Sequence, residues 1–167
     1  MNFKKLESGR SMVEMLGVLA IIGVLSVGGI AGYSLGMRKH RANQIVDVAS
    51  KYAVLGYNKC QQRILNGEIS GEAYGNNEWN ADMIAGCDGG GNNLKFEEAG
   101  VGAVPAGVDW FGEATVLTNT ESGDDTVAVS IYLDDDKLCK AIGSVTGSST
   151  ANCYPYHPGI AVFFKQN

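Results

Sequence analysis

Gly9-Arg10-Ser11-Met12-Val13-Glu14 opens the part of the chain that decides the fold, and an uncharged apolar run follows it over residues 15–37. A helix rises about 1.5 Å per residue, so this run reaches roughly 34 Å, enough to cross a bilayer core of about 30 Å. Glu14 borders the run, where burying a charge is costly. The stretch therefore predicts a transmembrane helix that carries one acid near its start.

These residues resemble the amino terminus of the type IV pilins: a short basic leader ending in Gly9, then Ser11-Met12-Val13-Glu14, then the apolar run. In that family a prepilin peptidase cuts after the glycine and methylates the new terminal amine, and the fifth mature residue is a glutamate. Cleavage between Gly9 and Arg10 makes Glu14 the fifth residue, so the register agrees. The resemblance covers about the first third of the chain. Arg10 stands where the family usually carries phenylalanine or methionine, so N-methylation of Arg10 is left open.

The resemblance implies that residues 1–9 are removed and that residues 10–38 form the transmembrane and polymerising half of a long helix. In a filament, Glu14 would pair with the α-amine of Arg10 on a neighbouring subunit. Removing one member of such a buried pair costs several kcal/mol, about 3–5, so the pair would set the axial register. The alternative is an acid that is solvated at the membrane interface.

Three glycines recur every four residues in the apolar run, at Gly28, Gly32 and Gly36. This spacing is typical of helices that approach each other closely, so we expect these glycines to take part in filament assembly. We also expect residues 23–32 to unwind locally in the assembled fibre. The alternative is ordinary glycine in a membrane helix.

Four cysteines lie beyond the apolar run, and their even number favours two disulfides formed in an oxidising compartment. Of three connectivities, Cys60–Cys87 with Cys139–Cys153 closes the shortest loops and is favoured. The second pair also matches the layout of the carboxy-terminal disulfide loop of pilins. The cysteine spacing does not indicate zinc, and the sequence shows no metal site, cofactor site or catalytic set. Since disulfides form outside the cytoplasm, they place residues 39–167 outside.

The net charge of −5 disfavours nucleic acid as a partner, because phosphate binding requires a basic surface. Asp134-Asp135-Asp136 is interpreted as a helix cap and first turn instead of a metal site. Tyr154, Tyr156 and His157 are candidates for surface contacts, with core or turn packing as the alternative.

The fold class expected is α+β, with one helix over about residues 10–66 and a small antiparallel sheet. The second half of this long helix is amphipathic. One of its faces is formed by Ile45, Val48, Ala49, Tyr52, Leu55, Gly56 and Cys60. Residues 67–113 are predicted to be mostly loop, with a short helix at 79–85. Residues 114–167 hold the sheet and the disulfide loop, with strands at 113–119, 126–133 and 159–165 and a helix at 135–142 that ends at Gly143.

The expected function is that of a structural subunit of a bacterial type IV pilus, serving adhesion, motility or DNA transfer. Its expected partners are other copies of itself, minor pilins, the prepilin peptidase and the pilus assembly platform. It would reside in the inner membrane first and in an extracellular fibre later. The alternatives are a pseudopilin of a type II secretion system and a membrane-anchored binding module that never polymerises. No enzymatic activity is expected.

Overall fold

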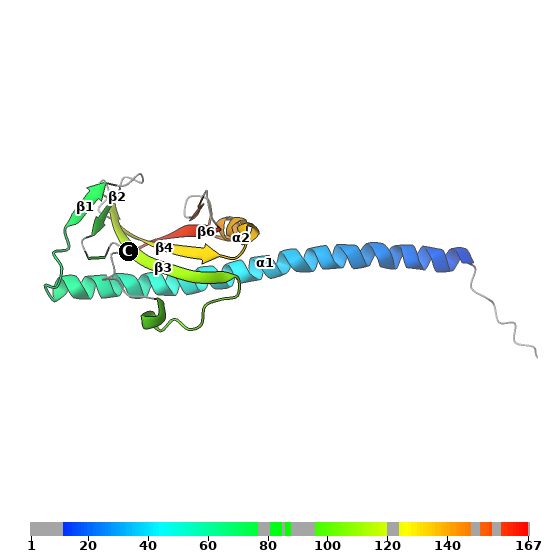
Figure 1. Ribbon diagram of the computed structural model, residues 1–167. Helices are drawn as coiled ribbons and strands as arrows, with labels where there is room; N and C mark the ends of the chain where they lie inside the picture. Colours follow the sequence, from blue (N-terminus) through cyan, green and yellow to red (C-terminus); the bar gives the residue numbers. More distant parts are fainter. Residues whose placement is uncertain are drawn as a thin grey trace, which may run out of the picture. The chain divides into compact units, whose positions relative to one another are not determined.

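The computed structural model describes residues 12–76, 81–84, 86–87, 96–119, 124–147, 151–154 and 158–166. The chain divides into two compact units, Met1–Met37 and Arg38–Asn167. Helix α1, Met12–Leu65, belongs to both units and contains 54 residues (Figure 1). The long helix expected over residues 10–66 is therefore confirmed from Met12 to Leu65, while Arg10 and Ser11 lie outside the described residues.

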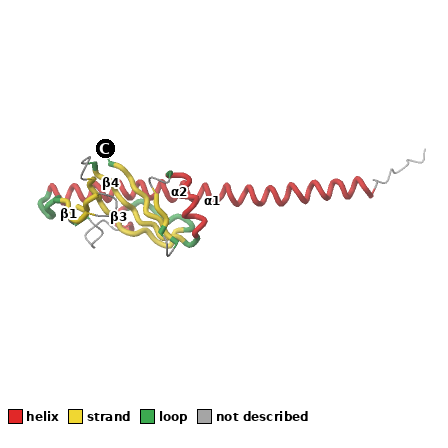
Figure 2. Tube along the Cα trace, turned by 90° about the horizontal axis from the view of Figure 1, so that it is seen from above, coloured by secondary structure: helices red, strands yellow, loops and turns green. Residues whose placement is uncertain are grey.

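The second unit contains a six-stranded antiparallel sheet with the order β1-β2-β3-β4-β6-β5. A helix and an antiparallel sheet in separate layers form the α+β arrangement that the sequence predicts (Figures 1 and 2). The bounds of its elements are β1 Ala73–Asn76, β2 Ala81–Ile84, the 3-10 helix η1 Phe96–Ala99, β3 Val108–Asn119, β4 Asp125–Leu133, α2 Asp136–Thr146, β5 Ala151–Cys153 and β6 Gly159–Lys165.

The core of the second unit lies between the later half of α1 and the inner face of the sheet. From α1 it takes buried residues that recur every three or four positions: Ala42, Ile45, Ala49, Tyr52, Ala53, Gly56 and Cys60. The Tyr52 ring meets Phe96 edge-on at 5.4 Å and Phe111 at 6.4 Å. Leu55, predicted on this face, is 37% exposed. One residue before Gly56, it is turned by about 100° towards solvent.

β4 is half-buried, as its alternating sequence predicts. Val127, Val129, Ile131 and Leu133 point into the core, and the residues between them are partly exposed. β6 pairs with β4 in register from Thr126↔Lys165 to Tyr132↔Gly159 and has the predicted bounds. β3 begins at Val108, five residues before the predicted start, because its first residues pair with the end of β4.

The prediction of loop over residues 67–113 is wrong in part, because this segment contains β1, β2, η1 and the start of β3. The predicted helix at 79–85 is also wrong. Its residues 81–84 form β2, which pairs with β1 on one side and with residues 117–119 of β3 on the other. Pairing with strands on both sides outweighs a weak local helix preference in four residues.

α2 begins as predicted, because Asp135 is the N-cap and its Oδ1 accepts a hydrogen bond of 2.8 Å from the backbone N–H of Lys137. It does not end at Gly143. A glycine inside a helix costs only about 1 kcal/mol relative to alanine, so the helix continues to Thr146 and ends at Gly147, whose φ is 89°. β5 lies in the segment predicted to be loop.

Candidate functional site

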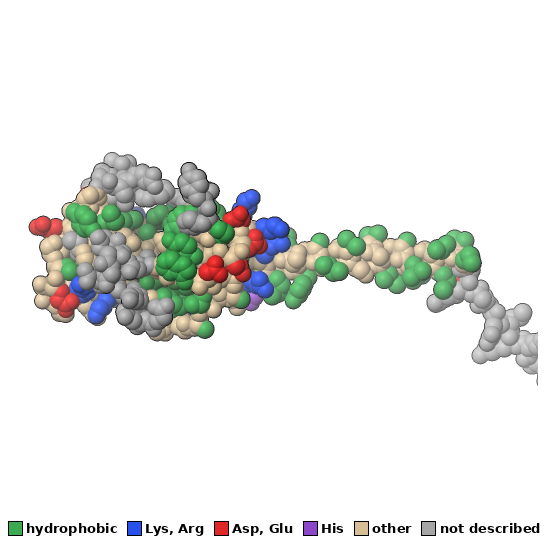
Figure 3. All heavy atoms as spheres, in the orientation of Figure 1, with side chains coloured by type: hydrophobic (Ala, Val, Ile, Leu, Met, Phe, Trp, Pro, Cys, Tyr) green, Lys and Arg blue, Asp and Glu red, His purple; other side chains and the backbone are tan. Residues whose placement is uncertain are grey.

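Residues 12–37 of α1, here called the apolar arm, form a continuous apolar stretch that is exposed. Every residue from 12 to 36 is exposed, and large apolar side chains such as Met12 and Ile30 are 81% and 71% exposed. The described part of the chain has one helix long and apolar enough to cross a membrane, judged by length and composition alone. So much exposed apolar surface is unfavourable in water, and it marks a site for lipid or protein contact (Figure 3).

Glu14 lies in the first turn of α1 and is the one charged residue of the arm. A carboxylate is favoured there because the first backbone N–H groups of a helix carry partial positive charge. The predicted cleavage site, Gly9 and Arg10, lies outside the described residues. The predicted contact between Glu14 and Arg10 of a neighbouring subunit therefore stays a prediction.

The glycines of the arm have no packing role within the chain. A Cβ built at Gly28, Gly32 or Gly36 would meet nothing within 4 Å. Glycine destabilises an exposed helix by about 1 kcal/mol relative to alanine. No packing contact of these glycines within the chain offsets that cost. The described helix is continuous through residues 23–32. The predicted unwinding concerns the assembled fibre and stays a prediction.

Helix geometry places these glycines in line with Glu14. Gly32 follows Glu14 by 18 positions (32 − 14), which at 3.6 residues per turn is five turns. Gly28 and Gly36 lie about one turn before and after Gly32. The face where another helix could approach most closely is therefore the face that carries the acid. We call Glu14, Gly28, Gly32 and Gly36 the glycine seam. The sequence spacing contains this alignment, although the glycine repeat alone does not show it.

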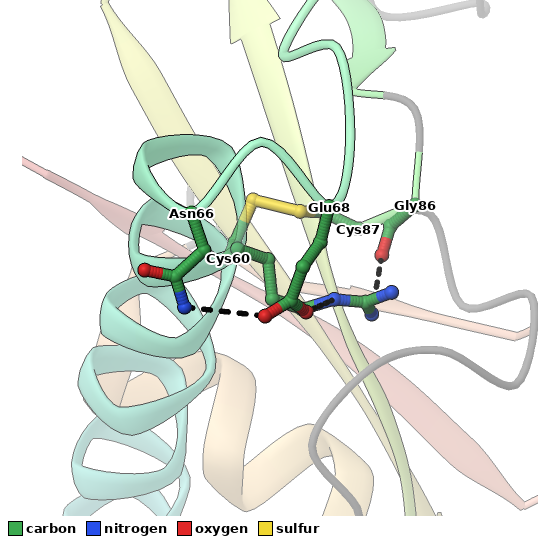
Figure 4. A network of polar contacts seen from close by, with 6 residues as sticks. Cys60, Asn66, Glu68, Gly86 and Cys87 are labelled. Carbon is green, nitrogen blue, oxygen red and sulfur yellow. Dashed lines mark hydrogen bonds and ion pairs between the residues drawn. A yellow bond between two sulfur atoms is a disulfide. The ribbon is translucent and has the colours of Figure 1, made fainter.

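The first disulfide fixes the end of α1 to the segment that follows β2. Cys60 and Cys87 are joined across a Cα–Cα distance of 5.7 Å, as predicted. Close by, Arg63 Nε lies 3.4 Å from Glu68 Oε2, and Arg63 Nη1 donates to the Gly86 carbonyl at 3.3 Å (Figure 4). Asn66 Nδ2 donates to Glu68 Oε1 at 3.1 Å. The end of the long helix is thus held covalently and by polar contacts.

The second disulfide joins α2 to β5. Cys139 is buried and Cys153 exposed, and their Cα atoms lie 6.1 Å apart, again the predicted pair. Tyr154 follows directly; it is partly buried, and its hydroxyl donates to Ser130 Oγ at 2.8 Å. The other two contact candidates, Tyr156 and His157, lie outside the described residues. Among the described residues, no group of three or more His, Cys, Asp or Glu side chains is placed to hold a metal ion.

A polar contact that the sequence does not predict connects α1 with the end of β3 and the start of β4. The Tyr57 hydroxyl donates to Asp125 Oδ2 at 3.0 Å, and Thr118 Oγ1 donates to Asp125 Oδ1 at 2.6 Å. Burial, and then the hydrogen bond and charge of Asp125, raise the pKa of Tyr57 above its ordinary value. Tyr57 and Asp125 are 68 positions apart, so no local pattern reveals the contact.

The structure thus combines an exposed apolar arm, bearing one acid in line with three glycines, with a small domain closed by two disulfides. Comparisons of the chain with protein family models, with curated proteins and with solved structures found no match.

Proposed function

We propose that this protein is a structural subunit of a type IV pilus or of a closely related filament, assembled through its apolar arm. The observation that carries the proposal is the glycine seam. A membrane anchor needs only apolar side chains, but an acid aligned with three glycines that nothing in the chain requires is suited to contact with another helix.

The arm would have two environments in succession. Before assembly, lipid covers its apolar side chains, and Glu14 lies close enough to the helix start to reach the interface. After assembly, the arms of other copies replace lipid. Glu14 then needs a cation, and removal of residues 1–9 would supply one at the α-amine of Arg10. The ion pair would form between subunits and fix their axial offset.

The remaining partners follow from the pilin resemblance. A prepilin peptidase would cut after Gly9, and the assembly platform with minor pilins would move the subunit from the inner membrane into an extracellular fibre. The two disulfides agree with a domain that folds in an oxidising compartment. We propose no enzymatic role.

A second candidate is a membrane-anchored module that does not polymerise. It is favoured by the apolar length of α1, which satisfies the needs of an anchor by itself. A pseudopilin would share the arm with a pilin and would differ in forming no long surface fibres.

Mass spectrometry of sheared cell-surface material from the native source tests the proposal. We expect fibres that contain this chain beginning at Arg10, with all four cysteines oxidised. The same spectrum decides whether Arg10 is methylated. A native protein that retains Met1, and that is recovered from the membrane alone, would contradict the proposal and support the anchored module.

A further inference from the structure

The outer face of the sheet carries a group of stacked aromatic rings. Trp110 on β3 is 50% exposed, and its ring stacks on Tyr132 of β4 at 4.1 Å with 7° between the planes. The Tyr132 ring lies 6.0 Å from that of Tyr154. The residues beside Trp110 and Tyr132 in sequence, such as Phe111 and Ile131, point into the core instead. We call Trp110, Tyr132 and Tyr154 the aromatic surface.

Two glycines leave room for these rings. A Cβ at Gly112 would lie 2.9 Å from Ser130 Cβ and 3.6 Å from the Trp110 ring. A Cβ at Gly159 would lie 2.6 Å from the Tyr154 ring. The backbone thus lets large rings lie against the outer face of the sheet, while half of Trp110 stays open to solvent.

Exposed acidic residues lie next to the aromatic surface in the sequence. Asp109 precedes Trp110, and Asp134 follows β4 and donates its backbone N–H to the Gly107 carbonyl at 3.2 Å. Asp135 and Asp136 come next in the sequence, followed by Lys137 and Lys140, so this part of the chain carries four carboxylates and two ammonium groups. Within the described part of the chain, Asp109 and Asp134 take part in no ion pair. Aromatic faces with an excess of carboxylates attract cations, arginine above all.

The chain carries a matching basic group. Arg38, Lys39 and Arg41 lie in α1 at the start of the second unit, and Lys39 and Arg41 are exposed. None of the three takes part in an ion pair within the described residues. The end of β4, α2 and this part of α1 lie at the same end of the second unit (Figures 1 and 3). Copies placed side by side in parallel with a small axial offset therefore bring the two groups to a similar level.

We propose that the aromatic surface, with Asp109 and Asp134, docks the basic segment Arg38–Arg41 of a second copy of this chain. The guanidinium and ammonium groups of one copy lie against Trp110 and pair with the two carboxylates of the next. Because different patches meet, the contact is head-to-tail and can repeat along a fibre. This inference rests on the proposed function, and it adds a contact between the domains to the contact between the arms.

A charge exchange in the full mature chain tests it. Variant A carries Asp109→Lys and Asp134→Lys, and variant B carries Lys39→Asp and Arg41→Asp. Assembly is started by diluting detergent, and the lowest concentration that gives sedimenting fibres is measured. We expect that concentration to rise roughly tenfold for A alone and for B alone, because like charges then face each other. An equimolar mixture of A and B should return to the wild-type value, because every A–B contact is complementary. Trp110→Ala should raise it a few-fold.

Three other outcomes would contradict either the docking contact or the proposed function. If A and B assemble like the wild type, or no worse than the control Lys59→Asp, the docking contact is wrong. If a chain carrying all four substitutions recovers but the mixture does not, the groups pair within one chain and the inference also fails. If the wild-type chain forms no fibres, the proposed function itself fails. Should a variant lose its cooperative thermal transition, the neutral changes Asp→Asn, Lys→Gln and Arg→Gln at the same positions give the weaker form of the same comparison.

Discussion

Gly56 of α1 and Ala114 of β3 approach so closely that a Cβ built at Gly56 would lie 2.9 Å from the Cβ of Ala114. Real Cβ contacts essentially never come so near, and neither atom belongs to a flexible side chain. The spacing between helix and sheet therefore depends on glycine at this position. The glycines of the arm are in the opposite situation, since a Cβ there would meet nothing.

Gly56→Ala should destabilise the second unit by about 1–2 kcal/mol. The steric cost of forcing helix and sheet apart, typically about 1–3 kcal/mol, is only partly offset by the helix preference of alanine, at about 1 kcal/mol. Denaturant unfolding of the full chain in detergent, followed by near-ultraviolet circular dichroism, measures the change. Gly32→Ala is the control and should leave this transition unchanged. Equal unfolding midpoints for the two variants would show that the close approach is not required.

Gly32→Leu should impair assembly, because a large side chain in the glycine seam keeps neighbouring helices apart. Gly23→Leu is a matched control. Gly23 precedes Gly32 by nine positions (32 − 23), or two and a half turns, so it lies on the opposite face of the arm. Fibre yield under the dilution assay should fall for Gly32→Leu and stay near the wild-type yield for Gly23→Leu. Equal yields from the two variants would mean that the seam has no special role.

Glu14→Ala should abolish or strongly reduce incorporation into fibres while leaving the second unit as stable as before. An unpaired terminal amine in a bundle of apolar arms costs several kcal/mol, about 3–5 by analogy with broken buried ion pairs. Glu14→Asp keeps the charge on a shorter side chain and should retain part of the yield. Mixed fibres with wild-type subunits, quantified by mass spectrometry, measure incorporation. Full incorporation of Glu14→Ala into these fibres would show that assembly does not need the acid and would contradict the proposed ion pair.

Replacing both cysteines of one disulfide by serine should destabilise the second unit. The loops closed by Cys60–Cys87 and Cys139–Cys153 separate their ends by 27 and 14 positions, and the loop-entropy model gives roughly 3–4 kcal/mol for each. Unfolding midpoints of the two double variants are compared with the wild type under oxidising conditions. The Cys60/Cys87 variant should lose slightly more, since it opens the longer loop. No loss in either variant would contradict the view that the disulfides stabilise the domain.

Stability should fall at alkaline pH. The pKa values of Tyr57 and Tyr154 are both raised above the ordinary value of about 10, and burial is the largest cause for each. The folded state then keeps these protons at a pH where the unfolded state releases them. The contribution of these two tyrosines to the free energy of unfolding is therefore constant below about pH 10 and decreases as the pH rises above it. Tyr57→Phe should lower stability at neutral pH by about 0.5–1.5 kcal/mol, through loss of the bond to Asp125, and should flatten the alkaline decrease. An unchanged pH profile in this variant would show that Tyr57 contributes nothing to it.

Some elements could be predicted from the sequence because their signals are local. The apolar run and the three- and four-residue spacing of Ile45, Ala49 and Tyr52 predict α1, and the alternation from Val127 to Leu133 predicts β4. The two disulfide pairs that short loops favour among three connectivities are the pairs that form. The seam was partly predictable, since its glycines and its acid were each identified, but their alignment needs a continuous helix between them.

The missed elements depend on partners that are distant in sequence. β2 exists because residues 81–83 pair with residues 117–119, and the link between Tyr57 and Asp125 joins α1 to β4. Four-residue strands have too little pattern to outweigh a weak helix preference before their partners are known. The aromatic surface is similar, because Trp110 and Tyr132 become neighbours only through the pairing of β3 with β4.

A density map of the native assembled protein, obtained by electron cryo-microscopy at side-chain resolution, tests the central claim most directly. We expect residues 12–36 of many copies to pack together in the fibre interior, with the glycine seam at helix contacts. The Glu14 carboxylate should lie within ion-pair distance of the Arg10 α-amine of a neighbouring copy. Arms surrounded by lipid or detergent, with no contact between copies and with residues 1–9 still attached, would contradict the account.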